Sequence, residues 1–122
     1  MLVHMTVPAQ SLSVLRSELA PARPTVLEQE LAYQPGAIVS RTIAKARGGS
    51  VTLFAFDAGQ ELSEHTAPFD AFVQVLDGSV ELTIGGEKVL ARTGETTRMP
   101  GGIPHAVRAP ERFKMLLVLV RD

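Results

Sequence analysis

The chain has 122 residues, a single-domain length with room for one hydrophobic core. Hydrophobic residues make up 45% and charged residues 20%, which predicts a folded domain and not a disordered segment. There is no cysteine, so disulfides, thiolate zinc sites, iron–sulfur clusters and cysteine nucleophiles are excluded. The formal net charge is −1 and no basic cluster exists, so we expect no nucleic-acid partner.

Membrane and export signals are also missing from the sequence. The longest uninterrupted apolar run, Met115 to Val120, is far too short to cross a bilayer. The beginning of the chain has no basic segment followed by an apolar stretch, so no signal peptide is expected. We therefore expect a cytoplasmic protein with no membrane partner.

The chain begins with a segment that differs from the rest. Residues 1–35 are interrupted by prolines, and Thr25 and Glu28 have the spacing of a capping box at the start of a helix. Pro35 and the glycine after it end that helix. We expect an N-terminal arm with one short helix, followed by residues 36–122 as the main body of a single domain.

The main body has the pattern of strands and tight turns. The pairs Asp77-Gly78 and Gly85-Gly86 suit two-residue hairpins, whose central residues need positive φ. Residues 79–84 alternate polar and apolar side chains, as in a strand with one wet face. About eight strands, with no helix expected after residue 35, predict an all-β antiparallel barrel or sandwich.

The last strand is apolar on both faces. Residues 115–120 show no alternation, so a barrel interior would cover only one of the faces. We expect a partner subunit to cover the other, because two-fold homodimers are the commonest soluble oligomers. The alternative is that residues 1–33 fold back over it.

Two of the three histidines lie in blocks of glycine and proline. The second block reads G-x5-P-x-G-x2-H from Gly94 to His105, and the first places Gly59 six residues before His65. This arrangement resembles the cupin superfamily, in which two β-hairpin motifs face one another, and the resemblance covers roughly residues 36–120. It implies a cupin-type double-stranded β-helix, that is, a jelly-roll barrel.

The first block departs from the pattern of the family. That pattern is G-x5-H-x-H-x3,4-E-x6-G, and here Ala67 stands at the second histidine position. The glutamate position falls on Ala71, or on Phe72 if the loop is one residue longer. The resemblance implies that His65 and His105 are the two remaining ligands of a divalent metal, namely Fe, Mn, Ni, Cu or Zn.

A metal with two histidine ligands needs further donors, since protein sites generally use three or four. Gln74, Asp70 and Glu64 are the candidates. Gln74 reaches such a site only if its strand turns that face inward; otherwise it is an outward-facing surface residue. The alternative role of Asp70 is to cap a turn after Pro68.

Three functions follow from these residues. The first is a metal-dependent enzyme, of dioxygenase or isomerase type, acting on a small organic substrate in a pocket lined by Phe56, Phe72 and Met99. The second is a metal-free module that binds a sugar-like or other polar metabolite between the same two histidines. The third is a structural or regulatory dimer with a vestigial pocket. The sequence has no Ser-His-Asp spacing and assigns no catalytic residue.

Overall fold

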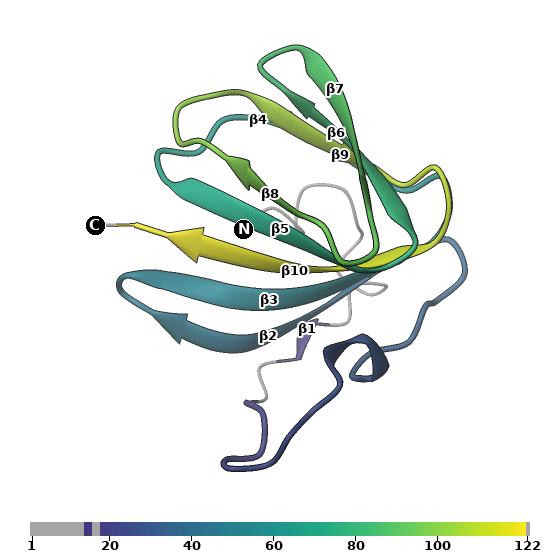
Figure 1. Cartoon of the computed structure of the whole chain (residues 1–122), viewed down its shortest axis with the longest axis vertical. Coiled ribbons are helices and arrows are strands. Elements are labelled where there is room, and N and C mark those ends of the chain that lie inside the picture. Colours follow the sequence, from purple (N-terminus) through teal and green to yellow (C-terminus); the bar gives the residue numbers. More distant parts are fainter. Residues whose placement is uncertain (1–13, 16–17, 122) are drawn as a thin grey trace.

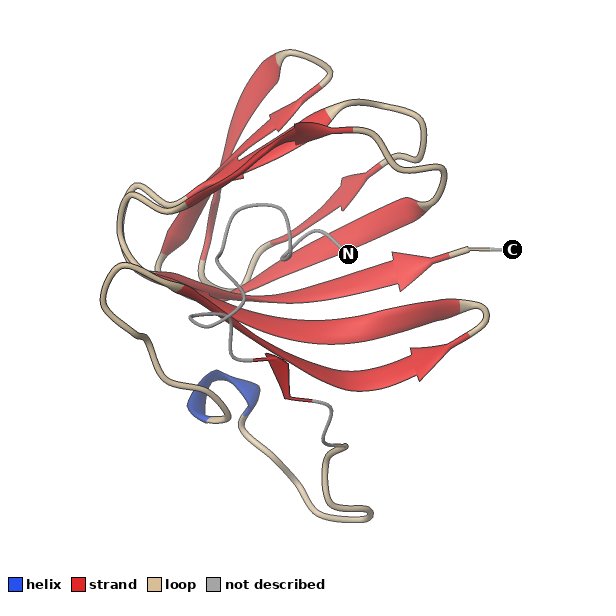
Figure 2. Cartoon of the chain, turned by 180° about the vertical axis from the view of Figure 1, so that it is seen from behind, coloured by secondary structure: helices blue, strands red, loops and turns tan. Residues whose placement is uncertain are grey.

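The computed structural model describes residues 14–15 and 18–121, and within them two sheets pack face to face (Figures 1 and 2). The single helical turn there is a 3-10 helix, η2, and no described helix has the length and apolar character needed to cross a bilayer. The described elements, in chain order, are β1 (Val14–Leu15), η2 (Leu27–Gln29), β2 (Ile38–Ala46), β3 (Gly49–Phe56), β4 (Glu61–His65), β5 (Asp70–Asp77), β6 (Ser79–Ile84), β7 (Glu87–Arg92), β8 (Thr96–Met99), β9 (His105–Arg108) and β10 (Phe113–Val120).

The two sheets have six and four strands. The larger has the order β1-β2-β3-β10-β5-β8 and the smaller the order β4-β9-β6-β7. Every described pairing is antiparallel except that of β1 with β2. In Figure 1 the sheets meet along one side and diverge at the other, as the two halves of a barrel do. The prediction of an all-β jelly-roll barrel is confirmed.

The core lies between the sheets and is built around aromatic rings. Phe56 stacks on Phe113 with ring centroids 4.6 Å apart, and the ring of Phe54 lies 6.0 Å from that of Phe56. All three side chains are fully buried. Because side chains alternate along a strand, Leu53 and Ala55 lie on the opposite face of β3, yet they are buried too. The large sheet is therefore covered on both faces at this point.

The outer cover is a segment of the same chain, residues 27–36, which we call the strap (Figure 2). Its apolar residues pack with Leu53, Ala55 and Leu116 on the outer face of the large sheet. Polar contacts also fasten it: the Lys114 ammonium donates to the Glu28 carbonyl at 2.6 Å, the Tyr33 hydroxyl donates to Asp77 at 2.5 Å, and Arg41 forms an ion pair with Glu30 at 2.8 Å. Over this part of β10 the structure shows the alternative cover considered above, in which the N-terminal arm folds back.

The predicted capping box is wrong. The N-cap of η2 is Val26, which makes no side-chain cap, and the Thr25 hydroxyl instead donates to the Arg23 carbonyl at 3.2 Å. Short helices gain most of their stability from packing, and here apolar side chains dock on the sheet after a single turn. Docking of Leu27 and Leu31 therefore decides the local structure.

The two predicted hairpin turns differ in outcome. Gly85 and Gly86, with φ of +58° and +85°, join β6 to β7 as a two-residue hairpin, which confirms that prediction. Gly78 does not close a hairpin, because β5 belongs to the large sheet and β6 to the small one. The chain changes sheets there, in a tight corner where a Cβ on Gly78 would lie 2.2 Å from the Arg112 carbonyl oxygen.

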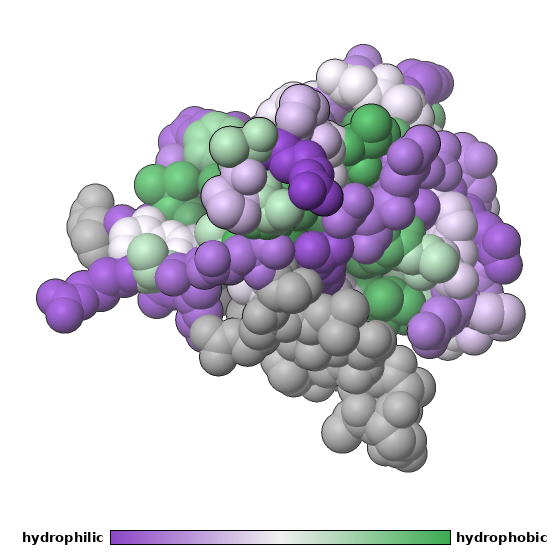
Figure 3. All heavy atoms as spheres, turned by 90° about the horizontal axis from the view of Figure 1, so that it is seen from below, coloured by the Kyte–Doolittle hydropathy of each residue, from purple (hydrophilic) through white to green (hydrophobic). Residues whose placement is uncertain are grey.

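The far end of β10 is only partly covered. Leu117 and Leu119 point into the core, whereas Val120 is 49% exposed. On the outer face, Val118 borders a shallow groove with Ile43 and Val51. The space-filling view from below shows hydrophobic residues in separate small patches between hydrophilic ones (Figure 3).

Candidate functional site

The fold brings two histidines together from strands that lie 40 residues apart in the sequence. His65 ends β4 and His105 begins β9, and the two are directly paired in the antiparallel register of the small sheet. Their ring centroids are 4.3 Å apart with an interplanar angle of 72°. His105 is only 2% exposed. His4, the third histidine, lies outside the described residues.

The hydrogen bonds of these rings fix where their protons lie. The Nδ1 of His65 is 2.9 Å from the Ser63 carbonyl oxygen, and the Nδ1 of His105 is 3.2 Å from that of Ile103. A carbonyl oxygen only accepts, so each Nδ1 carries a proton and donates. Both Nε2 atoms are buried with no hydrogen-bond partner in the described part of the chain. In the neutral imidazole each Nε2 is then an unused acceptor.

A cavity of about 180 Å³ adjoins the two rings. Of the described residues in its wall, Thr66 is the only polar one besides the histidines, and none is charged. The apolar part of the wall consists of Ala67, Pro68, Phe69, Ala71 and Leu119. The site is therefore a small apolar space beside two buried imidazoles.

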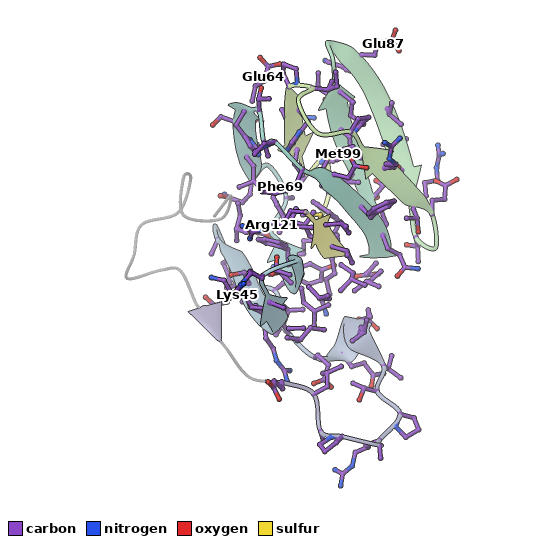
Figure 4. All side chains as sticks on the ribbon, turned by 90° about the vertical axis from the view of Figure 1, so that its left-hand side faces the viewer. Lys45, Glu64, Phe69, Glu87, Met99 and Arg121 are labelled. Atoms are coloured by element: carbon purple, nitrogen blue, oxygen red, sulfur yellow. The ribbon has the colours of Figure 1, made fainter. Side chains whose placement is uncertain are left out.

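Two loops at the mouth of this cavity are joined to each other. The Gly102 amide donates to the Ala67 carbonyl at 2.8 Å, and the Gly101 amide donates to the Asp70 carboxylate at 2.9 Å. A Cβ on Gly101 would lie 3.0 Å from the backbone of Phe69, so the two backbones touch. On its outer side the Phe69 ring is covered by the Arg121 guanidinium, 5.2 Å from the ring centroid (Figure 4).

Asp70 has a structural role at this mouth. The Gly101 amide, followed by the Arg98 guanidinium, holds the pKa of the Asp70 carboxyl below its usual value. Its carboxylate is thus occupied by a loop contact and an ion pair to Arg98 at 3.1 Å. Glu64, the other acidic candidate, is exposed at the outer edge of the molecule (Figure 4).

Gln74 is not brought to the histidines. Along β5, Ala71, Val73 and Val75 pack into the barrel core, so Gln74 and Phe72 lie on the opposite face of the strand. Phe56 and Met99 do lie inside the barrel, but they pack in its core and do not line the histidine cavity. The geometry thus corrects the expected positions of all four residues.

The donor atoms present do not complete a metal site. The described residues contain no group of three or more His, Cys, Asp or Glu side chains able to hold an ion. Ala67 and Ala71 both line the cavity, and neither carries a donor atom. Two imidazoles remain, fewer than the three or four protein ligands that resident metals generally use. The described residues by themselves therefore do not fit a bound metal ion.

The sequence analysis missed part of the cavity wall. Thr66, Phe69 and Leu119 line it and were not singled out. A signal exists for Leu119, because it has the same parity as Leu117 on the inward face of β10. Thr66 and Phe69 lie in the loop between β4 and β5, whose shape depends on its contacts with the loop before β9.

Stability is expected to fall as the pH falls below about 6.5, the ordinary pKa of histidine. Burial, together with the charge of His65, holds the pKa of His105 below its usual value, against the opposing effect of the Ile103 carbonyl. The unfolded chain then binds the proton more tightly, so this stabilisation is present above that pH and is lost below it.

Urea titrations at pH 7.5 and pH 5.5 test this linkage. The midpoint of wild type should fall more between the two pH values than that of His105→Gln, which has no titrating ring at position 105. Asp57 and Asp70, whose pKa values are lowered, titrate at lower pH and are common to both proteins. Equal declines of the midpoint in the two proteins would contradict the assignment of this pH dependence to His105.

The fold and the histidine pair define a small jelly-roll barrel with its site at the mouth, between the ends of β4 and β9. The sequence model of the cupin domain matches residues 52–120, more than half of the chain. The chain belongs to the cupin family.

Solved structures agree with this assignment. A conserved protein of unknown function from Streptococcus pyogenes is 38% identical, with a TM-score of 0.83 over 88% of this chain and 95% of that one. A cupin barrel protein from Leptotrichia buccalis is 40% identical, with a TM-score of 0.72 over 75% of this chain and 44% of that one. A cupin superfamily protein from Desulfitobacterium hafniense, 24% identical with a TM-score of 0.82 over 88% and 98%, supports the fold. No curated protein sequence matches the chain.

Proposed function

We propose that the protein binds a small molecule in the cavity beside His65 and His105. The observation that carries this proposal is the pair of buried Nε2 acceptors with no partner among the described residues. Buried polar atoms in proteins are nearly always hydrogen-bonded, so two exceptions side by side need a physical reason. A ligand that occupies the adjoining cavity and donates to them supplies it.

A metal-dependent enzyme is the second candidate, favoured by the same two imidazoles. A divalent Fe, Mn, Ni, Cu or Zn ion bound there would supply Lewis-acid or redox chemistry for a dioxygenase or isomerase reaction. Its remaining ligands have to come from outside the described residues, which hold no third donor at the site. The metal-free pocket is therefore the better supported function. The homodimer and the cytoplasmic location stay predictions.

Ring-nitrogen NMR of the ¹⁵N-labelled full chain, kept in EDTA, tests ligand binding directly. In a screen of small neutral and charged fragments, at least one should shift the Nε2 resonances of both histidines in a saturable manner. His105→Ala should lose that response. Arg108→Ala, on the exposed face of the same strand, should keep it. If no fragment moves either resonance, the proposal fails.

Elemental analysis distinguishes the second candidate. Wild type purified without chelator should carry well under one metal ion per chain, even after incubation with Fe, Mn, Ni, Cu and Zn salts. About one ion per chain in wild type, lost in His65→Ala, would establish the metal-dependent reading instead.

A further inference from the structure

We infer that the ligand of the histidine cavity is a small, neutral, mostly apolar molecule with N–H or O–H donors at one end. This inference rests on the proposed function and names the class of molecule that the site takes. It differs from the sugar-like ligand that the sequence suggested. Three features of the cavity carry it: the state of the two imidazoles, the chemistry of the wall and the volume.

Each imidazole has one acceptor, its Nε2 atom, which has no partner among the described residues and needs a hydrogen-bond donor. Each Nδ1 proton is already used on a main-chain carbonyl, so only the Nε2 lone pairs of His65 and His105 remain for a ligand. His105 is only 2% exposed, and burial disfavours the charged form of an imidazole. The two ring centroids lie 4.3 Å apart, and a group with two N–H bonds, such as a primary amide, has one donor for each of the two acceptors.

The wall excludes charge and multiple hydroxyl groups. Among the described residues no lysine, arginine, aspartate or glutamate lines the cavity, so a carboxylate or phosphate would have no counterion from them. Thr66 is the only other polar residue in the described part of the wall, and it leaves most hydroxyls of a sugar without a partner there. Ala67, Pro68 and Phe69 instead favour an apolar ligand body.

The volume favours a small ligand. A cavity of about 180 Å³ is smaller than the roughly 300–1,000 Å³ of pockets that hold drug-sized molecules. The part of the ligand that enters this cavity is therefore small. Ala71, on the inward face of β5, helps to leave this space open because its side chain is a single methyl group.

A matched pair of probes tests the class. Isobutyramide and isobutyrate have the same shape and size, but the first is a neutral donor and the second an anion; xylose represents the sugars. The titrations use the full chain in EDTA at pH 8, above the ordinary pKa of histidine, and follow the Nε2 resonances. Isobutyramide should bind at least tenfold more tightly than isobutyrate or xylose.

Two variants localise the binding. Ala71→Leu should fill the cavity and weaken isobutyramide binding at least tenfold, whereas Phe72→Leu, on the outer face of the same strand, should leave the affinity unchanged. Equal or tighter binding of isobutyrate or xylose would overturn the ligand class while the binding site itself stands. The class also fails if none of the three probes binds but another fragment in the screen does. If no fragment shifts either Nε2 resonance, the proposed function is overturned as well.

Discussion

Replacing Phe56 with alanine is expected to lower the free energy of unfolding by about 3–5 kcal/mol, the usual loss for a fully buried phenylalanine. Phe56 is the middle ring of the aromatic core, between Phe54 and its stacking partner Phe113. Removal of the ring therefore leaves a cavity that both neighbours border. Urea titration at pH 7.5, with the slope shared between wild type and variant, measures the effect.

Phe72→Ala is the matched control for this experiment. Phe72 lies on the outer face of β5 and is only partly buried, so the same truncation should cost about 1 kcal/mol. Both phenylalanines were expected to line the pocket, and the two variants separate their positions. Equal losses would contradict the inward placement of Phe56 and the outward placement of Phe72.

Gly78→Ala is expected to cost about 1–3 kcal/mol more than Gly86→Ala. Both glycines have positive φ, +77° and +85°, so the left-handed conformation penalises alanine by a similar amount at each position. At Gly86 the added methyl group meets nothing within 4 Å, whereas at Gly78 it would lie 2.2 Å from the Arg112 carbonyl oxygen. The excess at Gly78 is the cost of moving that backbone.

The comparison is made by urea titration of the two variants beside wild type, at the same pH. A thermal scan of each protein adds an independent ranking. If Gly86→Ala is as damaging as Gly78→Ala, conformation alone explains both losses, and the tight corner between the two sheets is not a close packing point.

The barrel could be predicted from the sequence because strands and turns leave local patterns in it. Residues 79–84 alternate, Gly85 and Gly86 supply a positive-φ turn, and both features appear as expected. Asp77-Gly78 has an equally good turn signal, but a sequence pair does not say whether the next strand joins the same sheet. That choice depends on which strands β5 and β6 meet elsewhere in the chain.

Gln74 shows why the site was only partly predictable. The alternation along β5 is clear, but both faces carry apolar residues, so polarity does not tell which face points inward. Leu76, on the face of Gln74, packs with the outer cluster under the strap. The strap begins some 50 residues earlier in the chain. A cover formed by the N-terminal arm was only one of the two alternatives that the sequence left open. Without that long-range contact, the inward face of β5 stays undetermined.

The joined loops at the cavity mouth have a consequence for how ligands are selected. Gly101 and Gly102 tie the loop before β9 to residues 67–70, so neither loop lifts without breaking hydrogen bonds to the other. These hydrogen bonds oppose a widening of the mouth. If the cavity binds a ligand as proposed, steric fit would then set the discrimination between homologous molecules, with a loss of affinity at the first methylene that exceeds the available space.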